Sequence, residues 1–186
     1  FVHGGDVIAV AVCRERTVVE VFPGAPIAPT ATRGDLWVYV ADIGNNSGAR
    51  TDLRFYRFQR AALSGPADVV PVDTIRFHYA DQTDYTPVPD GTNWDAEAVL
   101  AFDDSLYIFT KNWADERTHH YVLPARPGEQ VAIRRGEFDT QGLITGATRD
   151  PDQGTIVLLG HSRLSMEPFI WMLRPSPGQG PFGGAT

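Results

Sequence analysis

Residues 93–123, NWDAEAVLAFDDSLYIFTKNWADERTHHYVL, decide the fold of this chain. Three apolar, β-prone runs lie within this stretch, at 98–102, 106–110 and 118–123. A tight acidic turn at 103–105 separates the first two runs, and a polar loop at 111–117 separates the second from the third. Short runs of this kind, bounded by turn residues, are typical of antiparallel strands. The stretch therefore predicts a three-stranded β-meander.

Further β-rich runs lie on both sides of this meander. None of them has a sustained helical period, so the sequence predicts an all-β chain. The segment 23–33 contains three prolines and a glycine, which exclude a helix or a central strand and predict a loop. The other predicted strands are 6–12, 17–22, 35–43, 53–58, 73–79, 130–138, 143–148, 155–160 and 168–173.

The strands recur with a fixed spacing. Leu106 and Ile156 begin matching strands fifty residues apart, and Tyr121 and Trp171 occupy one core position of the strands that follow. A period of roughly forty to fifty residues, with about four short strands per unit, is typical of β-propeller blades. We therefore predict a propeller or partial propeller of four-stranded antiparallel blades over residues 1–174, with about three and a half to four blades. Residues 175–186, rich in proline and glycine, are predicted to be a tail or linker.

Composition excludes several classes of protein. The formal net charge of −7 argues against a nucleic-acid surface, which needs clustered lysine and arginine. A single cysteine excludes an intrachain disulfide and a zinc site built from thiolates. No run of about eighteen apolar residues is present, so we expect no membrane-spanning helix. Because the chain begins at Phe1, we expect that a signal peptide has been removed or that the sequence is a fragment.

Two carboxylates precede the first strand of the meander. Asp95 and Glu97 are two residues apart in an extended segment, so their side chains lie on the same face. With Asp42 they form a candidate site for a hard cation such as Ca²⁺, which prefers oxygen ligands. The alternative is that these carboxylates accept hydrogen bonds from loop backbone or pair with Arg50 or Lys111. The sequence leaves both interpretations open.

Polar residues also follow two strands that we expect to end at the same rim. After the strand 106–110 come a cation, an amide and an indole, a combination that suits an anionic or sugar-like ligand. The same residues could instead cap the sheet, with the lysine neutralising Glu97. A second loop, at 42–50, is rich in asparagine, which is common in turns. The candidate ligand-binding residues are Asp42, Asn45, Asn46, Arg50, Lys111, Asn112 and Trp113.

Four motifs occur in order along the chain: DIGNN at 42–46 with Arg50, DAEA at 95–98, TK at 110–111 and TGA at 145–147. In this respect residues 35–173 resemble a family of bacterial, usually exported β-propellers of largely uncharacterised function. The resemblance implies a propeller fold and an extracellular or periplasmic location. Asn45 stands where the family has a second aspartate, and the family's acidic Asp-Trp-Glu segment has no counterpart between residues 23 and 35. The DAEA motif is also similar to the Asp-x-Glu-Gly motif of phytase-like and esterase-like propellers.

These observations favour a non-catalytic binding or scaffold protein that recognises an unknown ligand or protein partner at the channel rim. There is no Gly-x-Ser-x-Gly elbow, no glycine-rich phosphate loop and no His-Glu-x-x-His helix. The alternative is a calcium-dependent phosphoester hydrolase, in which Asp95 and Glu97 hold the metal, Arg50 and Lys111 bind the substrate anion, and metal-bound water attacks. A third interpretation is a purely structural domain. A partial propeller would be completed by further sequence or by self-association.

Overall fold

A computed structural model describes residues 6–13, 16–26, 37–59, 62, 69–102, 104–150 and 152–174, and the side chains of residues 37 onward within these ranges except Phe102. These residues form strands joined by turns and loops, with no α-helix among them, so the predicted all-β class is confirmed. The same part of the chain contains no helix long and apolar enough to cross a membrane. The strands are β1 (Asp6–Cys13), β2 (Arg16–Pro26), β3 (Trp37–Asp42), β4 (Arg54–Gln59), β5 (Asp73–Tyr79), β6 (Ala96–Phe102), β7 (Ser105–Thr110), β8 (Thr118–Pro124), β9 (Gly128–Phe138), β10 (Leu143–Arg149), β11 (Ile156–His161) and β12 (Pro168–Leu173).

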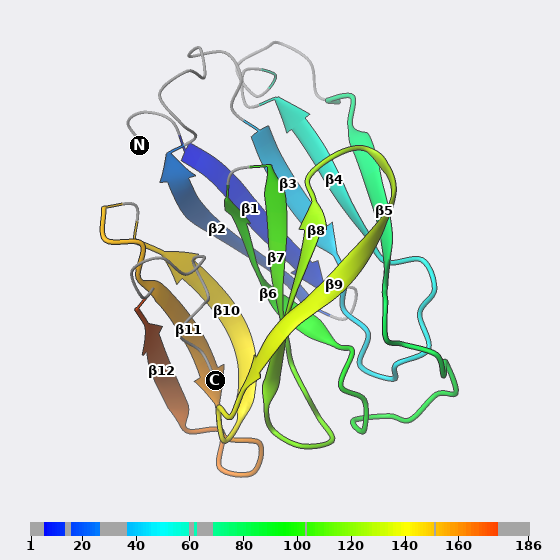
Figure 1. The fold of residues 1–186 in the computed structure, drawn as a ribbon, viewed down its shortest axis with the longest axis vertical. Helices are drawn as coiled ribbons and strands as arrows, with labels where there is room; N and C mark the ends of the chain where they lie inside the picture. The colour runs from blue at the N-terminus through cyan, green and yellow to red at the C-terminus, as the bar shows by residue number, and fades with distance from the viewer. Residues whose placement is uncertain are drawn as a thin grey trace.

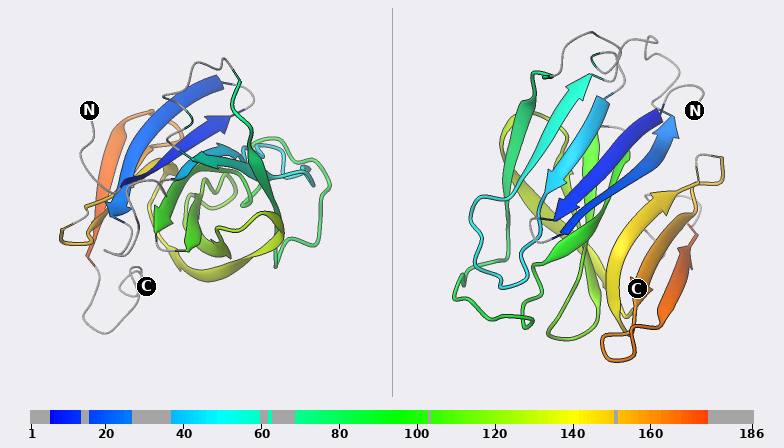
Figure 2. Two further views of the ribbon diagram at one scale, coloured as in Figure 1. Left: turned by 90° about the horizontal axis from the view of Figure 1, so that it is seen from above. Right: turned by 180° about the vertical axis from the view of Figure 1, so that it is seen from behind.

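The strands form two sheets (Figure 1). The larger one has the order β2-β1-β3-β4-β5-β9-β8-β7-β6, and the smaller one has the order β10-β11-β12. From β3 to β6 the larger sheet curls into a nearly closed, barrel-like wall, which Figure 2 shows from above. A parallel pairing of β5 with β9 joins the two halves of this wall. The small sheet lies beside it, with β10 against β6.

Most predicted strands are present, with one exception at the N-terminal side. The runs at 6–12 and 17–22 form the predicted hairpin, because β1 pairs with β2 in antiparallel fashion. The loop prediction is wrong for residues 23–26, since β2 continues to Pro26. β2 is an edge strand of the large sheet, where the N–H that proline lacks is not needed for pairing. Residues 27–36 and the predicted tail at 175–186 lie outside the described residues.

The fifty-residue spacing reappears as a repeat of strand register. In the pairing of β7 with β8, Ile108 lies opposite Tyr121. In the pairing of β11 with β12, Leu158 lies opposite Trp171, and both residues are fifty positions further along the chain. The strands of the two hairpins, β7–β8 and β11–β12, therefore pair in the same register, with the residue numbers shifted by fifty.

The strand that precedes each hairpin carries the same irregularity. The pairing of β6 with β7 shifts between Ala96 and Ala98, and the pairing of β10 with β11 shifts between Ile144 and Gly146. Each shift lies at the start of the first strand, which places both β-bulges at the same point of the unit. The strands β6–β7–β8 and β10–β11–β12 are thus two copies of one meander.

We predicted separate four-stranded blades, but the sheets of this structure are not divided in that way. The meander β6–β9 is a continuous antiparallel unit, as a blade would be. Its outer strand β9, however, also pairs with β5, which merges the meander with β3–β5 into one wall. The structure therefore establishes an all-β fold with a barrel-like sheet.

Two apolar cores hold the sheets together, and β6 contributes to both. Val99 and Ala101 of β6 face the core inside the barrel-like wall, whereas Ala98 and Leu100 face a second core against β10 and β11. Neighbouring side chains of a strand point to opposite faces, so the meander is covered on both sides. The fully buried side chains of the first core include Ile43, Leu53, Phe55, Ile75, Tyr79, Leu106, Ile108, Tyr121 and Leu123.

Trp171 does not take the core position that the repeat predicts. Its counterpart Tyr121 is fully buried, whereas Trp171 remains 36% exposed. The indole packs edge-on against Phe138 and donates a hydrogen bond to the carbonyl of Thr140. Tyr121 is covered because the wall folds over the inner face of β8, while β12 lies at the margin of the small sheet.

Candidate functional site

Four loops gather at one end of the strands and form what we call the loop rim. They are the β3–β4 loop (43–53), the end of the β5–β6 connection (88–95), the β7–β8 loop (111–117) and the β11–β12 loop (162–167). In Figure 1 these loops lie toward the lower end of the molecule. All seven predicted ligand-binding residues and the three predicted metal ligands lie in these loops or at the adjoining strand ends.

Asp95 joins three of these loops. Its side chain is fully buried. Oδ1 accepts hydrogen bonds from the backbone N–H of Asn45 (2.6 Å) and of Ala96 (3.0 Å), and Oδ2 accepts one from the indole Nε1 of Trp113 (2.9 Å). Burial raises the pKa of the Asp95 carboxyl, against the opposing effect of the Asn45 and Trp113 hydrogen bonds. Backbone pairing reinforces the junction, because the carbonyl of Asp95 accepts from the N–H of Lys111.

Glu97 and Lys111 form an ion pair beside this junction. The lysine Nζ lies 2.8 Å from Oε1 of Glu97, and the lysine is buried. The same Nζ lies 4.7 Å from the centre of the Trp113 ring, a distance at which a cation is attracted to the π face. The structural alternative that we drew from the sequence, in which Lys111 neutralises Glu97, is therefore present.

Arg163 brings a second cation to Trp113 and was not predicted as a site residue. Its guanidinium lies 5.8 Å from the Trp113 ring centre. It donates hydrogen bonds to the carbonyls of Trp113 (2.5 Å) and Asp90 (3.0 Å), which connects the β11–β12 loop to the rest of the rim. Arg163 lies fifty residues after Trp113, and only the position of the repeat could have pointed to it.

The β3–β4 loop is held by its own polar side chains. Asn45 is buried, accepts the N–H of Arg50 on Oδ1 and donates to the carbonyl of Trp94. Arg50 lies 2.9 Å from both Asp42 and Asp52 and also donates to the carbonyl of Gly44. Desolvation opposes the charge of Arg50, but its bonds to Asp52 and Asp42 prevail and raise the pKa of the guanidinium.

Asn46 and Asn112 complete the set of predicted residues. The carbonyl of Asn46 accepts the N–H of Asp90, which ties the β3–β4 loop to the β5–β6 connection. Asn112 is fully buried, receives a hydrogen bond from Thr110 and donates one to Asp115. Both asparagines thus shape the loops in which they lie.

The three predicted metal ligands do not form one cluster. Asp42 pairs with Arg50 and also lies 3.6 Å from Arg54, whereas Asp95 and Glu97 have the partners described above. Within the described residues, no group of three histidine, cysteine, aspartate or glutamate side chains is close enough to hold a metal ion. A calcium role for Asp42, Asp95 and Glu97 stays a prediction from the sequence.

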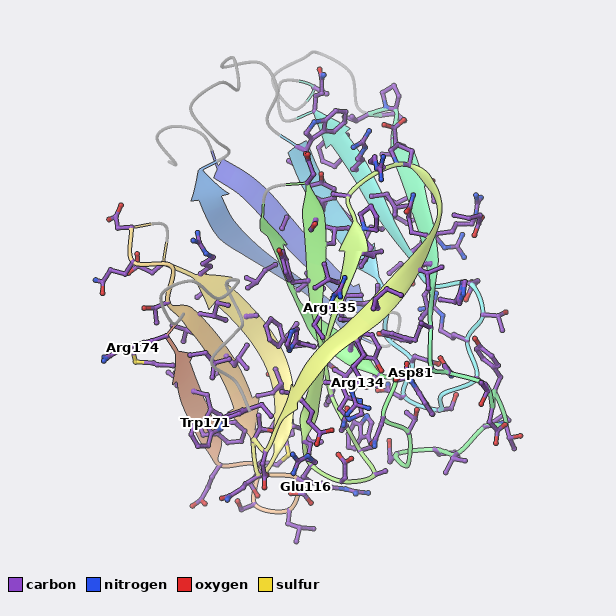
Figure 3. The ribbon with its side chains drawn as sticks, in the orientation of Figure 1. Asp81, Glu116, Arg134, Arg135, Trp171 and Arg174 are labelled. Atoms are coloured by element: carbon purple, nitrogen blue, oxygen red, sulfur yellow. The ribbon has the colours of Figure 1, made fainter. Side chains whose placement is uncertain are left out.

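A second polar group, outside the rim, was also not predicted. The hydroxyl of Tyr121 lies 3.0 Å from both carboxylate oxygens of Asp81, and Arg134 approaches the same carboxylate at 3.9 Å. Figure 3 shows Asp81 and Arg134 side by side. Arg134 also bonds to Glu137, so its charge is shared between two acids. Tyr121 and Asp81 are forty residues apart, and no local motif connects them.

Comparison of this chain with protein-family models, with curated proteins and with solved structures found no match in any of the three.

Proposed function

We propose that this chain is a non-catalytic binding domain, built from β-propeller blades, that recognises an anionic ligand at the loop rim. The observation that carries the proposal is the environment of Trp113. Two cations, Lys111 and Arg163, lie over this half-buried indole, in a chain whose net charge is −7. Glu97 and Asp95 lie beside the same indole, so the support for an anion comes from the hydrogen-bond donors of Arg163 and Lys111 that have no partner within the rim.

The repeat supports the interpretation as blades. Two meanders share one register and one bulge position, and β10 of the second meander lies against β6 of the first. Innermost strands of neighbouring blades have this relation around a propeller channel. The meander β6–β9 also buries apolar side chains on both faces, which a blade between two neighbours must do.

The rim is preorganised for binding. Asp95 fixes the indole of Trp113 through Nε1, and the carbonyl of Trp113 fixes Arg163. Two of the five guanidinium donors of Arg163 are used by backbone carbonyls, and one of the three ammonium donors of Lys111 is used by Glu97. An anion that meets the remaining donors would find them already in place, which lowers the entropic cost of binding.

The contacts of the acidic side chains at the rim favour a binding function over a catalytic one. Each of Asp42, Asp95 and Glu97 is engaged with a cation or with N–H donors, as in a network that maintains structure. Hydrolysis on clustered calcium would need several carboxylates free to face the ion. No observation on the described residues favours the hydrolase, so it remains the second interpretation. Export to the periplasm or cell exterior is proposed from the family resemblance alone.

Isothermal titration calorimetry with a matched pair of sugars tests the proposal. An oligomer of glucuronic acid carries the carboxylates that the site would bind, and a glucose oligomer of the same length lacks them. We expect the acidic oligomer alone to bind, and Arg163→Gln to weaken it about tenfold or more, because charge-assisted hydrogen bonds contribute about 1.5–3 kcal/mol.

Arg126→Gln is the matched control, since Arg126 follows β8 at the opposite end of the strands and is exposed. Equal binding of the two sugars, or equal loss in both arginine variants, would contradict an anion site at Trp113. Absence of binding by the acidic sugar, by inorganic phosphate and by citrate would contradict anion recognition at the rim altogether.

A further inference from the structure

The β11–β12 loop repeats the backbone of the β7–β8 loop fifty residues later in the chain. In the first loop the N–H of Glu116 donates to the carbonyl of Asn112 (3.0 Å), and Glu116 has a φ of 57°. In the second loop the N–H of Met166 donates to the carbonyl of Ser162 (3.1 Å), and Met166 has a φ of 60°. Figure 1 shows both loops toward the lower end of the molecule. The two loops are therefore copies of one turn, and both belong to the loop rim.

The two copies of this turn carry different side chains. Ala114 and Glu116 of the first loop correspond to Leu164 and Met166 of the second. Leu164 is 92% exposed, and Met166 is 63% exposed. A backbone with positive φ is uncommon at methionine, because the conformation is costly for a residue with a long side chain. The second loop thus holds two apolar side chains in solvent on a turn that the first loop builds with a small and a charged residue.

A third exposed apolar side chain, Val88, lies in the other loop that Arg163 contacts. The guanidinium of Arg163 donates to the carbonyl of Asp90 (3.0 Å). Val88 belongs to the same turn, because its carbonyl accepts the N–H of Gly91 (3.1 Å), and it is 50% exposed. Arg163 therefore has an exposed apolar side chain in each of the two loops that it joins, Val88 in one and Leu164 in the other. Exposed apolar side chains that gather beside polar groups mark interaction sites.

We propose that the ligand of the loop rim is the C-terminus of a polypeptide that ends in an apolar residue. The inference rests on the anion site of the proposed function and adds the chemistry of the partner. The free carboxylate binds the donors of Arg163 that have no partner within the rim, and the terminal side chain contacts Leu164 and Met166. A C-terminal residue carries its charge and its apolar side chain on one Cα atom, which matches a guanidinium followed directly by a leucine.

The charges of the rim favour a single carboxylate over a lipid surface. Asp90 and Glu167, two exposed acids, lie in the same two loops and repel an extended anionic surface such as a membrane. The net charge of −7 acts in the same direction. Stable attachment to a membrane also needs a large buried apolar area or a second anchor, which three apolar side chains do not supply. One carboxylate at Arg163, with one apolar group beside it, fits the patch.

Fluorescence anisotropy with three labelled tetrapeptides tests the partner. Gly-Ser-Gly-Leu with a free C-terminus carries both recognised groups, and its C-terminal amide lacks the charge. Gly-Ser-Gly-Ser with a free C-terminus lacks the apolar side chain. We expect the first peptide to bind about tenfold more tightly than either of the others, because each of them loses either a charge-assisted hydrogen bond or a buried apolar side chain.

Leu164→Ser separates the apolar contact from the anion site. It should remove the preference for the leucine peptide over the serine peptide and keep the preference for the free carboxylate over the amide. Ala114→Ser, at the equivalent position of the first loop, is the matched control and should change neither preference. Equal binding of the leucine and serine peptides to the native protein, or a preference for leucine that survives Leu164→Ser, would overturn the inference.

Two further measurements separate this inference from the proposed function. If the glucuronic acid oligomer binds in calorimetry but the leucine peptide binds no more tightly than the serine peptide, the apolar C-terminus is wrong and the anion site stands. If neither the oligomer nor any peptide with a free carboxylate binds, the anion site is wrong as well. In sedimentation with phosphatidylglycerol vesicles we expect the protein to stay in the supernatant. Co-sedimentation that Leu164→Ser abolishes would overturn the peptide in favour of a lipid surface.

Discussion

Replacing Asp95 with asparagine perturbs the junction of the loop rim with almost no change in size. The amide oxygen can still accept the N–H groups of Asn45 and Ala96. The amide nitrogen, however, takes the place of the oxygen that lies 2.9 Å from the indole Nε1 of Trp113. Two N–H donors then face each other in a buried position.

The expected loss follows from these contacts. A buried donor without an acceptor costs about 1–3 kcal/mol, and Asp95→Asn creates two. The substitution also removes a buried negative charge, which offsets part of this loss of stability. Burial disfavours the carboxylate, as the raised pKa of Asp95 indicates. We therefore expect Asp95→Asn to lower the free energy of unfolding by about 2–4 kcal/mol in urea denaturation. Asp152→Asn, at an exposed turn, is the matched control and should change it by less than about 0.5 kcal/mol.

The pH dependence has a defined sign. A pKa of the Asp95 carboxyl that is higher in the folded than in the unfolded protein makes this group most favourable below its unfolded pKa, and the contribution is lost as pH rises through the folded value. The stability advantage of the native protein over Asp95→Asn should therefore grow as pH falls from neutral. A loss at neutral pH no larger than that of Asp152→Asn would refute the role of Asp95 as the residue that joins the loops.

Three further substitutions test the packing. Tyr79→Phe should be neutral or stabilising by up to about 1 kcal/mol in urea denaturation, because the buried Tyr79 hydroxyl has no hydrogen-bond partner among the described residues; a loss above about 2 kcal/mol would show that it has one. Burial, reinforced by nearby Arg135 and Arg134, lowers the pKa of His120 to about 4. The unfolded protein therefore binds a proton that the folded protein does not, and the free energy of unfolding should fall by about 2–3 kcal/mol between pH 7 and pH 4.5 in the native protein but not in His120→Gln. Parallel pH profiles of the two proteins would contradict this. Gly48→Ala should cost about 1–3 kcal/mol, because Gly48 has a φ of +73° and an added Cβ would lie 2.7 Å from Oγ1 of Thr92; an unchanged melting temperature would contradict the strain.

Local pattern was sufficient to predict the strands. β5 and β12 have the bounds predicted from alternation and turn residues, and the other predicted strands agree within a few residues. The equivalence of Tyr121 and Trp171 could also be predicted from the sequence, because a repeated unit repeats its register. Their different burial could not be predicted, since it depends on which sheets lie beside β8 and β12.

Contacts between distant segments explain the remaining differences. The parallel pairing of β5 with β9 joins segments about fifty residues apart, and no local preference of Phe77 or Gln130 indicates it. The structural alternative for Glu97 and Lys111 was predicted because the two residues border neighbouring strands of one hairpin. Arg163 was missed because it reaches Trp113 from the next meander.

The most direct test of a binding rim is a titration followed by two-dimensional ¹H–¹⁵N NMR. The indole N–H of Trp113, bonded to Asp95, reports on the rim, and the indole N–H of Trp171, bonded to Thr140, reports on the small sheet. On addition of the glucuronic acid oligomer, we expect the Trp113 indole signal and the amide signals of Asn45 and Lys111 to move together and saturate, while Trp171 stays fixed. Saturating shifts at Trp171 with Trp113 unchanged, or no shift anywhere, would contradict ligand binding at the loop rim.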